Sequence, residues 1–310
     1  MDRTLVSVYA EEMIRLHDTA SFTQPLSTCV NEFAIDDAYV VALEVVRRRE
    51  RSGWRRAGRK IGFTNTSIWQ QYAVDRPMFG YMYQQTVNYS DTGKNSPSLK
   101  SERGSGGEVS SKQNLPNLPM GDGWGEGDAS GTPLLPLSGL VQPLIEPEIC
   151  FKLKAPLPPS GDPVELLRAV DWIGHGFEIV QCHFPDWKFA IEDTIADGGL
   201  HGRYVVGPVL PIADGSEPEL ARHLATFTIS LSRDGEAMAT GGGANVLGSP
   251  VQALAHLAEL LASLPDHPPL EAGELITTGT LTDALPISPG ETWSTQIEGL
   301  DLAGFHLHLT

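Results

Sequence analysis

Cysteine is scarce in this chain, with Cys29, Cys150 and Cys182 the three among 310 residues. They are scattered and no C-x-x-C spacing occurs, which argues against a disulfide framework and against a thiolate zinc site. Scattered thiols of this kind are typical of a reducing compartment, and we therefore expect a cytoplasmic protein. Apolar runs long enough to cross a bilayer are missing, and so are the basic region and apolar core of a secretion signal. No membrane partner is therefore predicted.

Positive charge is also in short supply. Lysine and arginine number 22 against 39 aspartates and glutamates, and the formal net charge is −17. This balance disfavours binding to nucleic acids and to anionic membranes, because both attract positive surfaces. The motifs G-x-S-x-G, G-x-x-x-x-G-K-[ST] and G-x-G-x-x-G do not occur. The glycine-rich segment 241–245 precedes a predicted helix, and both a tight turn and an anion cradle are open for it.

Hydrophobic periodicity predicts helices early in the chain and strands later. Helices are expected at 4–17 and 36–52, the second with Asp36 as its N-cap. A short strand at 58–63 and a helical turn at 67–72 follow, and a late helix is expected at 250–263. Further strands are expected at 144–153, 173–181, 203–208, 225–232 and 291–298. This order predicts an α+β fold rather than a repeating βαβ fold.

The chain is expected to divide into three parts. Residues 1–90 form an N-terminal helical and αβ region, and residues 133–310 form a β-rich catalytic core. Residues 91–132 are rich in Gly and Ser, and bury too little apolar surface to offset their ordering entropy. We expect a flexible insertion there, and a passive loop and a lid over a site are both open. Packing of Leu115, Leu118 and Trp124 would instead indicate an ordered segment.

Two carboxylates in the segment L-I-E-P-E-I-C-F are the strongest local signal. Glu146 and Glu148 stand two apart in an apolar, β-prone run, so a strand would turn both side chains to one face. Like charges in apolar surroundings repel unless a cation lies between them, and oxygen ligands suit magnesium, manganese or calcium. Glu178, in G-F-E-I-V, offers a third carboxylate from another predicted strand. A solvated polar strand face is the simpler interpretation of each acid taken alone.

Five motifs that follow one another along the chain carry a family resemblance. They are G-R-K-I-G-F-T at 58–64, V-D-R-P-M-F-G at 74–80, I-E-P-E at 145–148, F-E-I-V at 177–180 and T-T-G-T-L-T at 277–282. Together they resemble the fumarylacetoacetate hydrolase superfamily, and within it the branch of 2-oxopent-4-enoate hydratases and 4-oxalocrotonate (2-oxohex-3-enedioate) decarboxylases. The resemblance implies an α+β fold with a mixed β-roll core, an N-terminal helical region and a homo-oligomer.

The resemblance also implies a set of site residues. Glu146, Glu148 and Glu178 would hold Mg²⁺ or Mn²⁺. Lys60 would serve in the pocket as an acid/base or carboxylate-binding group, and Asp75 would line the same pocket. These assignments are carried over from the motifs in which the residues stand.

Further positions either match the family pattern or depart from it. Thr278 would lie near the substrate carboxylate, and the segments 186–188 and 192–194 would form a helix and turn beside the site. His201 stands where a small polar stretch is usual, so a pocket residue and a structural histidine are both open. Met78 replaces an acid that hydratases often carry, which counts against hydration. The histidine base of the C–C hydrolases in the superfamily is not evident.

We therefore expect a divalent-metal-dependent lyase that acts on 2-oxo-enoic acids of aromatic catabolism. A 2-oxo acid can chelate one divalent ion, which then stabilises an enolate, and Lys60 with a pKa lowered by desolvation would move the proton. Hydration of a 2-hydroxydienoate and decarboxylation of a 2-oxo-enedioate are both open. The alternatives are a C–C bond hydrolase or oxaloacetate-type decarboxylase with the same site, and a non-catalytic partner subunit of a pathway complex.

Overall fold

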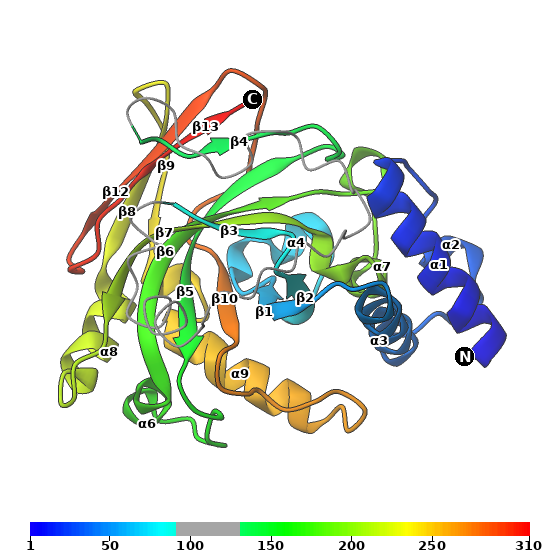
Figure 1. The fold of residues 1–310 in the computed structure, drawn as a ribbon, viewed down its shortest axis with the longest axis horizontal. Coiled ribbons are helices and arrows are strands. Elements are labelled where there is room, and N and C mark those ends of the chain that lie inside the picture. The colour runs from blue at the N-terminus through cyan, green and yellow to red at the C-terminus, as the bar shows by residue number, and fades with distance from the viewer. Residues whose placement is uncertain (91–130) are drawn as a thin grey trace, which may run out of the picture.

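The computed structural model of the protein describes residues 1–90 and 131–310. Almost all of the expected insertion, with Leu115, Leu118 and Trp124, lies outside the described residues. Within these two ranges, no helix combines the length and the apolarity that a bilayer crossing requires. The described residues form two sheets with helices around them, as Figure 1 shows, so the expected α+β class with a curled mixed sheet is confirmed.

The larger sheet has eight strands, in the order β2-β1-β10-β5-β6-β7-β3 with β11 paired to β5. Its strands are β1 (Arg56–Gly62), β2 (Met78–Tyr83), β3 (Val87–Tyr89), β5 (Leu144–Leu153), β6 (Val170–Val180), β7 (His201–Pro211), β10 (Leu275–Thr280) and β11 (Leu285–Pro286). The strands β5, β6 and β7 are long and curved, and the sheet bends around them (Figure 1). The pairing of β1 with β10 is parallel, whereas β5 pairs antiparallel with both β10 and β6. Segments far apart in the sequence therefore meet on one sheet.

The smaller sheet has five strands, in the order β4-β13-β12-β8-β9. They are β4 (Leu134–Leu135), β8 (Thr228–Arg233), β9 (Glu236–Gly242), β12 (Thr292–Glu298) and β13 (His306–Leu309). An apolar cluster joins this sheet to the larger one, because Ile145 and Phe177 are buried together with Leu231, Trp293 and Leu307. A turn at Asp234–Gly235 connects β8 to β9 as a hairpin, and the glycine-rich segment 241–245 ends β9 in a short 3-10 turn.

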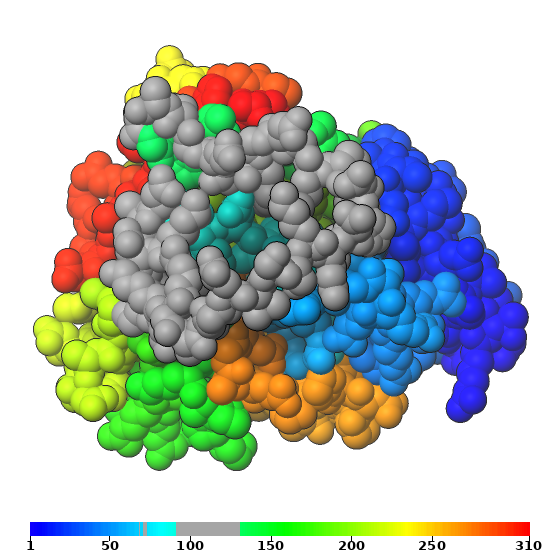
Figure 2. Space-filling model, in the orientation of Figure 1, coloured from blue at the N-terminus to red at the C-terminus, as the bar shows by residue number. Residues whose placement is uncertain are grey.

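Helices cover the larger sheet and extend from one end of it. They are α1 (Arg3–Thr19), α2 (Leu26–Cys29), α3 (Ile35–Arg51), α4 (Trp69–Tyr72), α6 (Pro163–Arg168), α7 (Ile191–Ala196), α8 (Glu217–Thr226) and α9 (Pro250–Ala262). The helices α1 and α3 pack on one another and form the blue end of the molecule in Figure 2. The helix α9 is amphipathic, with Val251, Leu254, Leu257 and Leu261 buried. These positions fit the helical repeat that the sequence predicts.

Most expected elements agree with the structure to within a few residues, and one cap does not. The expected strand 144–153 coincides with β5, and the expected helix 36–52 begins one residue earlier as α3. Asp36 is not the N-cap, because Ala34 occupies that position and its backbone N–H donates to the side chain of Asp37. Asp37, and not the predicted Asp36, therefore accepts the hydrogen bond at the start of α3.

Candidate metal centre

Three carboxylates meet on adjacent strands of the larger sheet. Glu146 and Glu148 lie on β5, and Glu178 lies on β6 directly opposite Glu146 in the antiparallel register. One carboxylate oxygen of each lies within 4.8 Å of an oxygen of the other two. The strand alternation of β5 brings the first two together, and the strand register adds the third.

Burial makes this cluster electrostatically costly. Burial together with the charge of Glu178 raises the pKa of Glu146 to about 7, although Lys60 opposes the shift. Burial and Glu178 also hold the pKa of Glu148 well above its usual range. Burial alone would raise the pKa of Glu178 too, but the charge of Lys60 and a hydrogen bond from His201 lower it to about 2. The three carboxylates therefore need more positive charge than Lys60 alone supplies.

The donor set of this cluster fits a hard divalent cation. Glu148 is fully buried, and its Oε2 accepts a hydrogen bond from the Gly279 backbone N–H at 2.9 Å. Its other oxygen, Oε1, is buried without a hydrogen-bond partner among the described residues. A buried carboxylate oxygen in this state is costly, and coordination to a cation would satisfy it. Oxygen-only ligands favour Mg²⁺, Mn²⁺ or Ca²⁺ over zinc or copper.

Lys60 is the cationic side chain beside the cluster. Its Nζ lies 2.9 Å from Glu178 Oε2, and the side chain is 4 % exposed. Lys60 and Gly62 both border the cavity described below, which is the shared face that strand alternation predicts for β1. Desolvation acts to lower the pKa of Lys60, but the charges of Glu178, Glu146 and Glu148 outweigh it and raise the pKa. The three surrounding acids cause this direction in the metal-free site, whereas the expected lowering assumes a bound cation and stays a prediction.

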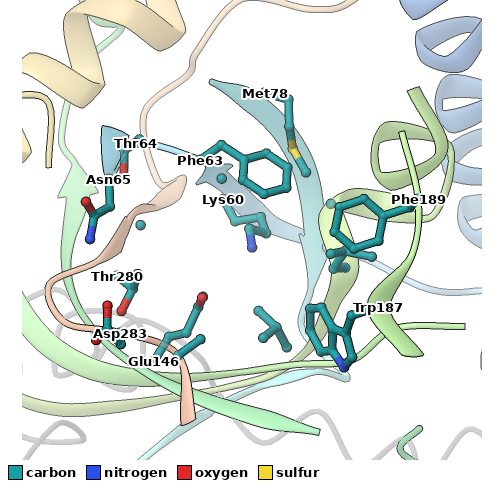
Figure 3. A pocket seen from close by; sticks show the side chains of 16 residues that line it. Lys60, Phe63, Thr64, Asn65, Met78, Glu146, Trp187, Phe189, Thr280 and Asp283 are labelled. Atoms are coloured by element: carbon teal, nitrogen blue, oxygen red, sulfur yellow. The ribbon is translucent and has the colours of Figure 1, made fainter. Parts of the chain in front are cut away.

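Lys60 and Glu146 line a cavity of about 240 Å³, which we call the carboxylate cavity. Figure 3 shows Lys60 between two unlike sides of it. One side carries Phe63, Met78, Trp187 and Phe189, and we call these four residues the apolar wall. The other side is polar, with Asn65, Glu146, Thr280 and Asp283. The cavity thus has one end suited to a charged group and one apolar side.

Backbone strain gathers around the carboxylate cavity. Phe63 and Trp187 have φ angles of 56°, and Leu200, which also lines the cavity, has a φ of 60°. A bulky residue in this left-handed region costs about 1–3 kcal/mol, and such residues cluster at functional sites. The Trp69 Nε1–H donates to the Phe63 carbonyl at 2.8 Å, and the Trp187 Nε1–H donates to the Gln142 carbonyl at 3.2 Å. Both strained aromatic residues are therefore held in place by tryptophan hydrogen bonds.

Asp75 and Thr278 do not line this cavity. Asp75 is exposed on the turn before β2, where Arg76 holds it through contacts of 2.8 and 2.9 Å. Its expected place in the pocket is therefore wrong. Thr278 is buried behind the cavity, and its hydroxyl donates to the Ile149 carbonyl at 2.9 Å. A register shift in β10 between Thr277 and Thr280 changes which side chains face inward, so Thr280 borders the cavity in place of Thr278.

His201 lies behind the carboxylates. Its Nδ1 donates to Glu178 Oε1 at 2.8 Å, and its Nε2 lies 2.8 Å from Thr86 Oγ1. The residue lines a second cavity, of about 340 Å³, rather than the carboxylate cavity. It therefore orients a carboxylate and is not placed to touch a substrate beside Lys60.

Sequence reasoning missed several residues of the carboxylate cavity. Phe63 lies inside a quoted motif, and Trp187 lies in the stretch expected beside the site, but neither was assigned to the cavity. Phe189 and Asp283 had no signal beyond their nearness in sequence to those motifs. Asn65 directly follows the first motif, and its side chain caps the next turn by accepting from the Ser67 N–H. Only the folded sheet shows that these positions share one cavity.

More than half of the chain, including the three carboxylates, matches a known protein family. The sequence model described as fumarylacetoacetate (FAA) hydrolase C-terminal matches residues 129–303. The chain belongs to the fumarylacetoacetate hydrolase family. All three carboxylates of the cluster fall inside the matched range, whereas Lys60 precedes it.

Relatives in this family align with nearly the whole chain. The 2-hydroxyhexa-2,4-dienoate hydratase of Comamonas testosteroni is 29% identical over 300 residues, which cover 96% of this chain and 96% of the relative. The 2-keto-4-pentenoate hydratase of Paraburkholderia xenovorans is 32% identical over 280 residues, with 89% and 85% covered. The 4-oxalocrotonate decarboxylase of Pseudomonas putida G7, solved with magnesium and adipate, superimposes with a TM-score of 0.78 at 24% identity, covering 100% and 99% of the two chains. This likeness shows the shared fold.

The hydrogen bond from His201 to Glu178 can be tested through the metal affinity of a variant. The variant His201→Phe keeps an aromatic ring but removes the hydrogen bond to Glu178. Removing a group that orients a metal ligand costs about 10–100-fold in metal affinity. We expect a loss of that size in Mn²⁺ affinity, measured by isothermal titration calorimetry, whereas the exposed His306 changed to Phe should leave the affinity unchanged. Equal affinities for wild type and His201→Phe would contradict the positioning role.

A second polar cluster fastens α1 to the core. His17 on α1 places its Nε2 2.9 Å from Asp197 Oδ1, and His183 places its Nδ1 2.9 Å from both Asp197 oxygens. Asp197 is fully buried. Burial acts to raise its pKa, but the two imidazoles hold the pKa of Asp197 far below its usual range. The carboxylate is therefore ionised and anchors two elements distant in sequence.

Asp197→Asn is expected to destabilise the fold. The amide removes the negative charge and replaces one carboxylate oxygen with an NH₂ group that cannot accept from His183, and a hydrogen bond to a charged group contributes about 1.5–3 kcal/mol. We expect the free energy of unfolding in urea to fall by about 2 kcal/mol or more. The exposed Asp301 changed to Asn is the control and should unfold like wild type. An unchanged midpoint for Asp197→Asn would show that the cluster contributes nothing.

Proposed function

We propose that this protein is a divalent-metal-dependent lyase that acts on 2-oxo-enoic acids. The observation that carries the proposal is the convergence of three carboxylates, two of them fully buried, with the buried Lys60 beside one cavity. The relatives named above, two hydratases of 2-oxo-enoic acids in their enol or keto forms, support the substrate class. The neighbour solved with magnesium supports the choice of metal.

Glu146, Glu148 and Glu178 would hold the cation, and His201 would keep Glu178 oriented. The cation would supply Lewis-acid polarisation of a 2-oxo acid. Lys60 borders the same cavity as Glu146, so its ammonium is placed to pair with the substrate carboxylate or to deliver a proton. The apolar wall would exclude water from one side of the substrate.

We place the protein in the cytoplasm as a homo-oligomer within the breakdown of aromatic compounds. The scattered cysteines support the compartment. Exposed apolar side chains on and around the N-terminal helices support self-association, namely Leu5, Val8, Phe22 and Val40. The relatives' dienoate substrates support the metabolic setting.

The decisive assay offers two substrates to the Mg²⁺-loaded protein. 2-Hydroxypenta-2,4-dienoate and 2-oxohex-3-enedioate are incubated separately, and NMR follows the product and the CO₂ formed. We expect conversion of at least one, loss of conversion with EDTA, and recovery when Mg²⁺ is added back. A 4-hydroxy-2-oxo acid indicates hydration and CO₂ indicates decarboxylation. If neither substrate reacts, the lyase proposal fails, and a C–C hydrolase or a non-catalytic partner subunit takes its place.

A further inference from the structure

The apolar wall lies across the carboxylate cavity from its polar side (Figure 3). Phe63 and Phe189 lie with ring centroids 6.3 Å apart, and Trp187 meets Phe189 edge-on at 6.4 Å. Met78 is 2 % exposed and its thioether lies beside Gly62, since a Cβ built on Gly62 would stand 3.3 Å from Met78 Cε. The wall is therefore a continuous surface of three rings and a thioether that reaches as far as Lys60 (Figure 3).

The charges around the cavity would already balance once a divalent cation is bound, before any substrate enters. Three carboxylates carry three negative charges, and Lys60 with one divalent cation carries three positive ones. Among the described residues that line the cavity, Lys60 is the one cationic side chain. It already pairs with Glu178. Asp283 lines the polar side and adds a further negative charge.

We propose that the apolar wall is a binding subsite for an uncharged distal carbon chain. The protein would then select monocarboxylic 2-oxo acids over dicarboxylic ones. The proposal rests on the proposed function, because it assumes that a 2-oxo acid group is anchored at the carboxylates. A distal carboxylate placed against the wall would lose its hydration without gaining a partner, because Lys60 is already paired with Glu178 and the polar residues lie on the opposite side. An alkyl end would instead bury apolar surface against the rings.

This selectivity decides between the two reactions. A substrate without a distal carboxylate has no such group to release as CO₂, so hydration is the reaction that is left. In that reaction the enol proton of a 2-hydroxy-2,4-dienoate leaves the oxygen as C5 gains a proton, which gives a 2-oxo-3-enoate. Water then adds its hydroxyl to C4 and a proton to C3, and the product is a 4-hydroxy-2-oxo acid. Met78, which counted against hydration in the sequence, contributes to the subsite that favours it.

A binding experiment separates this proposal from turnover. Calorimetry on the Mg²⁺-loaded protein compares 2-oxohexanoate with 2-oxoadipate, two six-carbon 2-oxo acids that differ in a terminal methyl or carboxylate. We expect 2-oxohexanoate to bind about 10-fold more tightly or better, because one unpaired desolvated carboxylate is a large penalty. Tighter or equal binding of 2-oxoadipate overturns the subsite, and so does a failure of both acids to bind.

A charge variant with a matched control tests whether the apolar wall sets the preference between the two acids. Phe189→Arg places a cation in the wall and should shift the affinity ratio toward 2-oxoadipate by about 10-fold, because it provides a charged hydrogen-bond partner. Thr240→Arg adds the same charge at an exposed position on β9, outside the cavity, and should keep the wild-type ratio. An equal shift in both variants would attribute the effect to net charge and overturn the proposal. If the binding preference holds but no dienoate is hydrated, the lyase proposal fails while the subsite stands.

Discussion

Replacing Glu148 by glutamine is expected to abolish tight divalent-cation binding and to cut turnover by about 10²–10³-fold or more, the range seen when one key electrostatic contact in an active site is removed. Glu148 is fully buried and its Oε1 has no hydrogen-bond partner among the described residues. Glutamine keeps the shape and can still accept from the Gly279 N–H through its amide oxygen. The variant therefore removes the charge that a cation requires and leaves the packing in place.

The midpoint of thermal unfolding gives a second test of Glu148→Gln, independent of turnover. A saturating cation stabilises the protein that binds it by about 2.7 kcal/mol at a hundred times the dissociation constant. We expect Mg²⁺ to raise the midpoint of wild type and of the exposed control Glu236→Gln, but not of Glu148→Gln. Without metal, Glu148→Gln should melt at the wild-type temperature or above it, because one of three repelling acids is gone. Full Mg²⁺ stabilisation of Glu148→Gln would remove this residue from the metal centre.

The cluster of three carboxylates was predictable because one strand supplies two of them. Glu146 and Glu148 share a face by the two-residue repeat of β5, which needs no tertiary knowledge. Glu178 needed more, since its place opposite Glu146 depends on the pairing register of β5 with β6. A single sequence contains no direct signal for that register, and the family motifs provided it. The same motifs placed Lys60, and the alternation of β1 explains why it faces the cavity.

The errors arose where local geometry breaks the simple repeat. The bulge in β10 exchanges Thr278 for Thr280 at the cavity, and alternation alone cannot reveal such a bulge. Asp75 lies in a turn, where no repeat fixes the direction of a side chain, and the adjacent Arg76 holds it at the surface. The apolar wall was not predicted, because Phe63 and Trp187 adopt left-handed backbone angles that the sequence does not indicate for bulky residues.

Lys60→Met should give the complementary result, with a loss of turnover of roughly 10²-fold or more if the amine moves a proton. Methionine has a similar length and no charge, and the neighbourhood is tight, since a Cβ on Gly199 would stand 3.2 Å from Lys60 Cδ. If the ammonium instead binds the substrate carboxylate, the Michaelis constant should rise while the turnover number changes little. The exposed Lys154 changed to Met is the control.

Metal-free stability separates Lys60 from Glu148 by the sign of the change. Lys60 Nζ lies 2.9 Å from Glu178 Oε2 and is the cation that the three acids share. Removing one partner of a buried ion pair destabilises a protein by about 3–5 kcal/mol, because the remaining charge is left uncompensated. Without metal, Lys60→Met should therefore melt well below wild type, whereas Glu148→Gln should not, and Mg²⁺ should restore part of the difference. Wild-type stability and unchanged kinetic constants for Lys60→Met would exclude Lys60 from the site, and would leave the three carboxylates as the whole of the proposed catalytic centre.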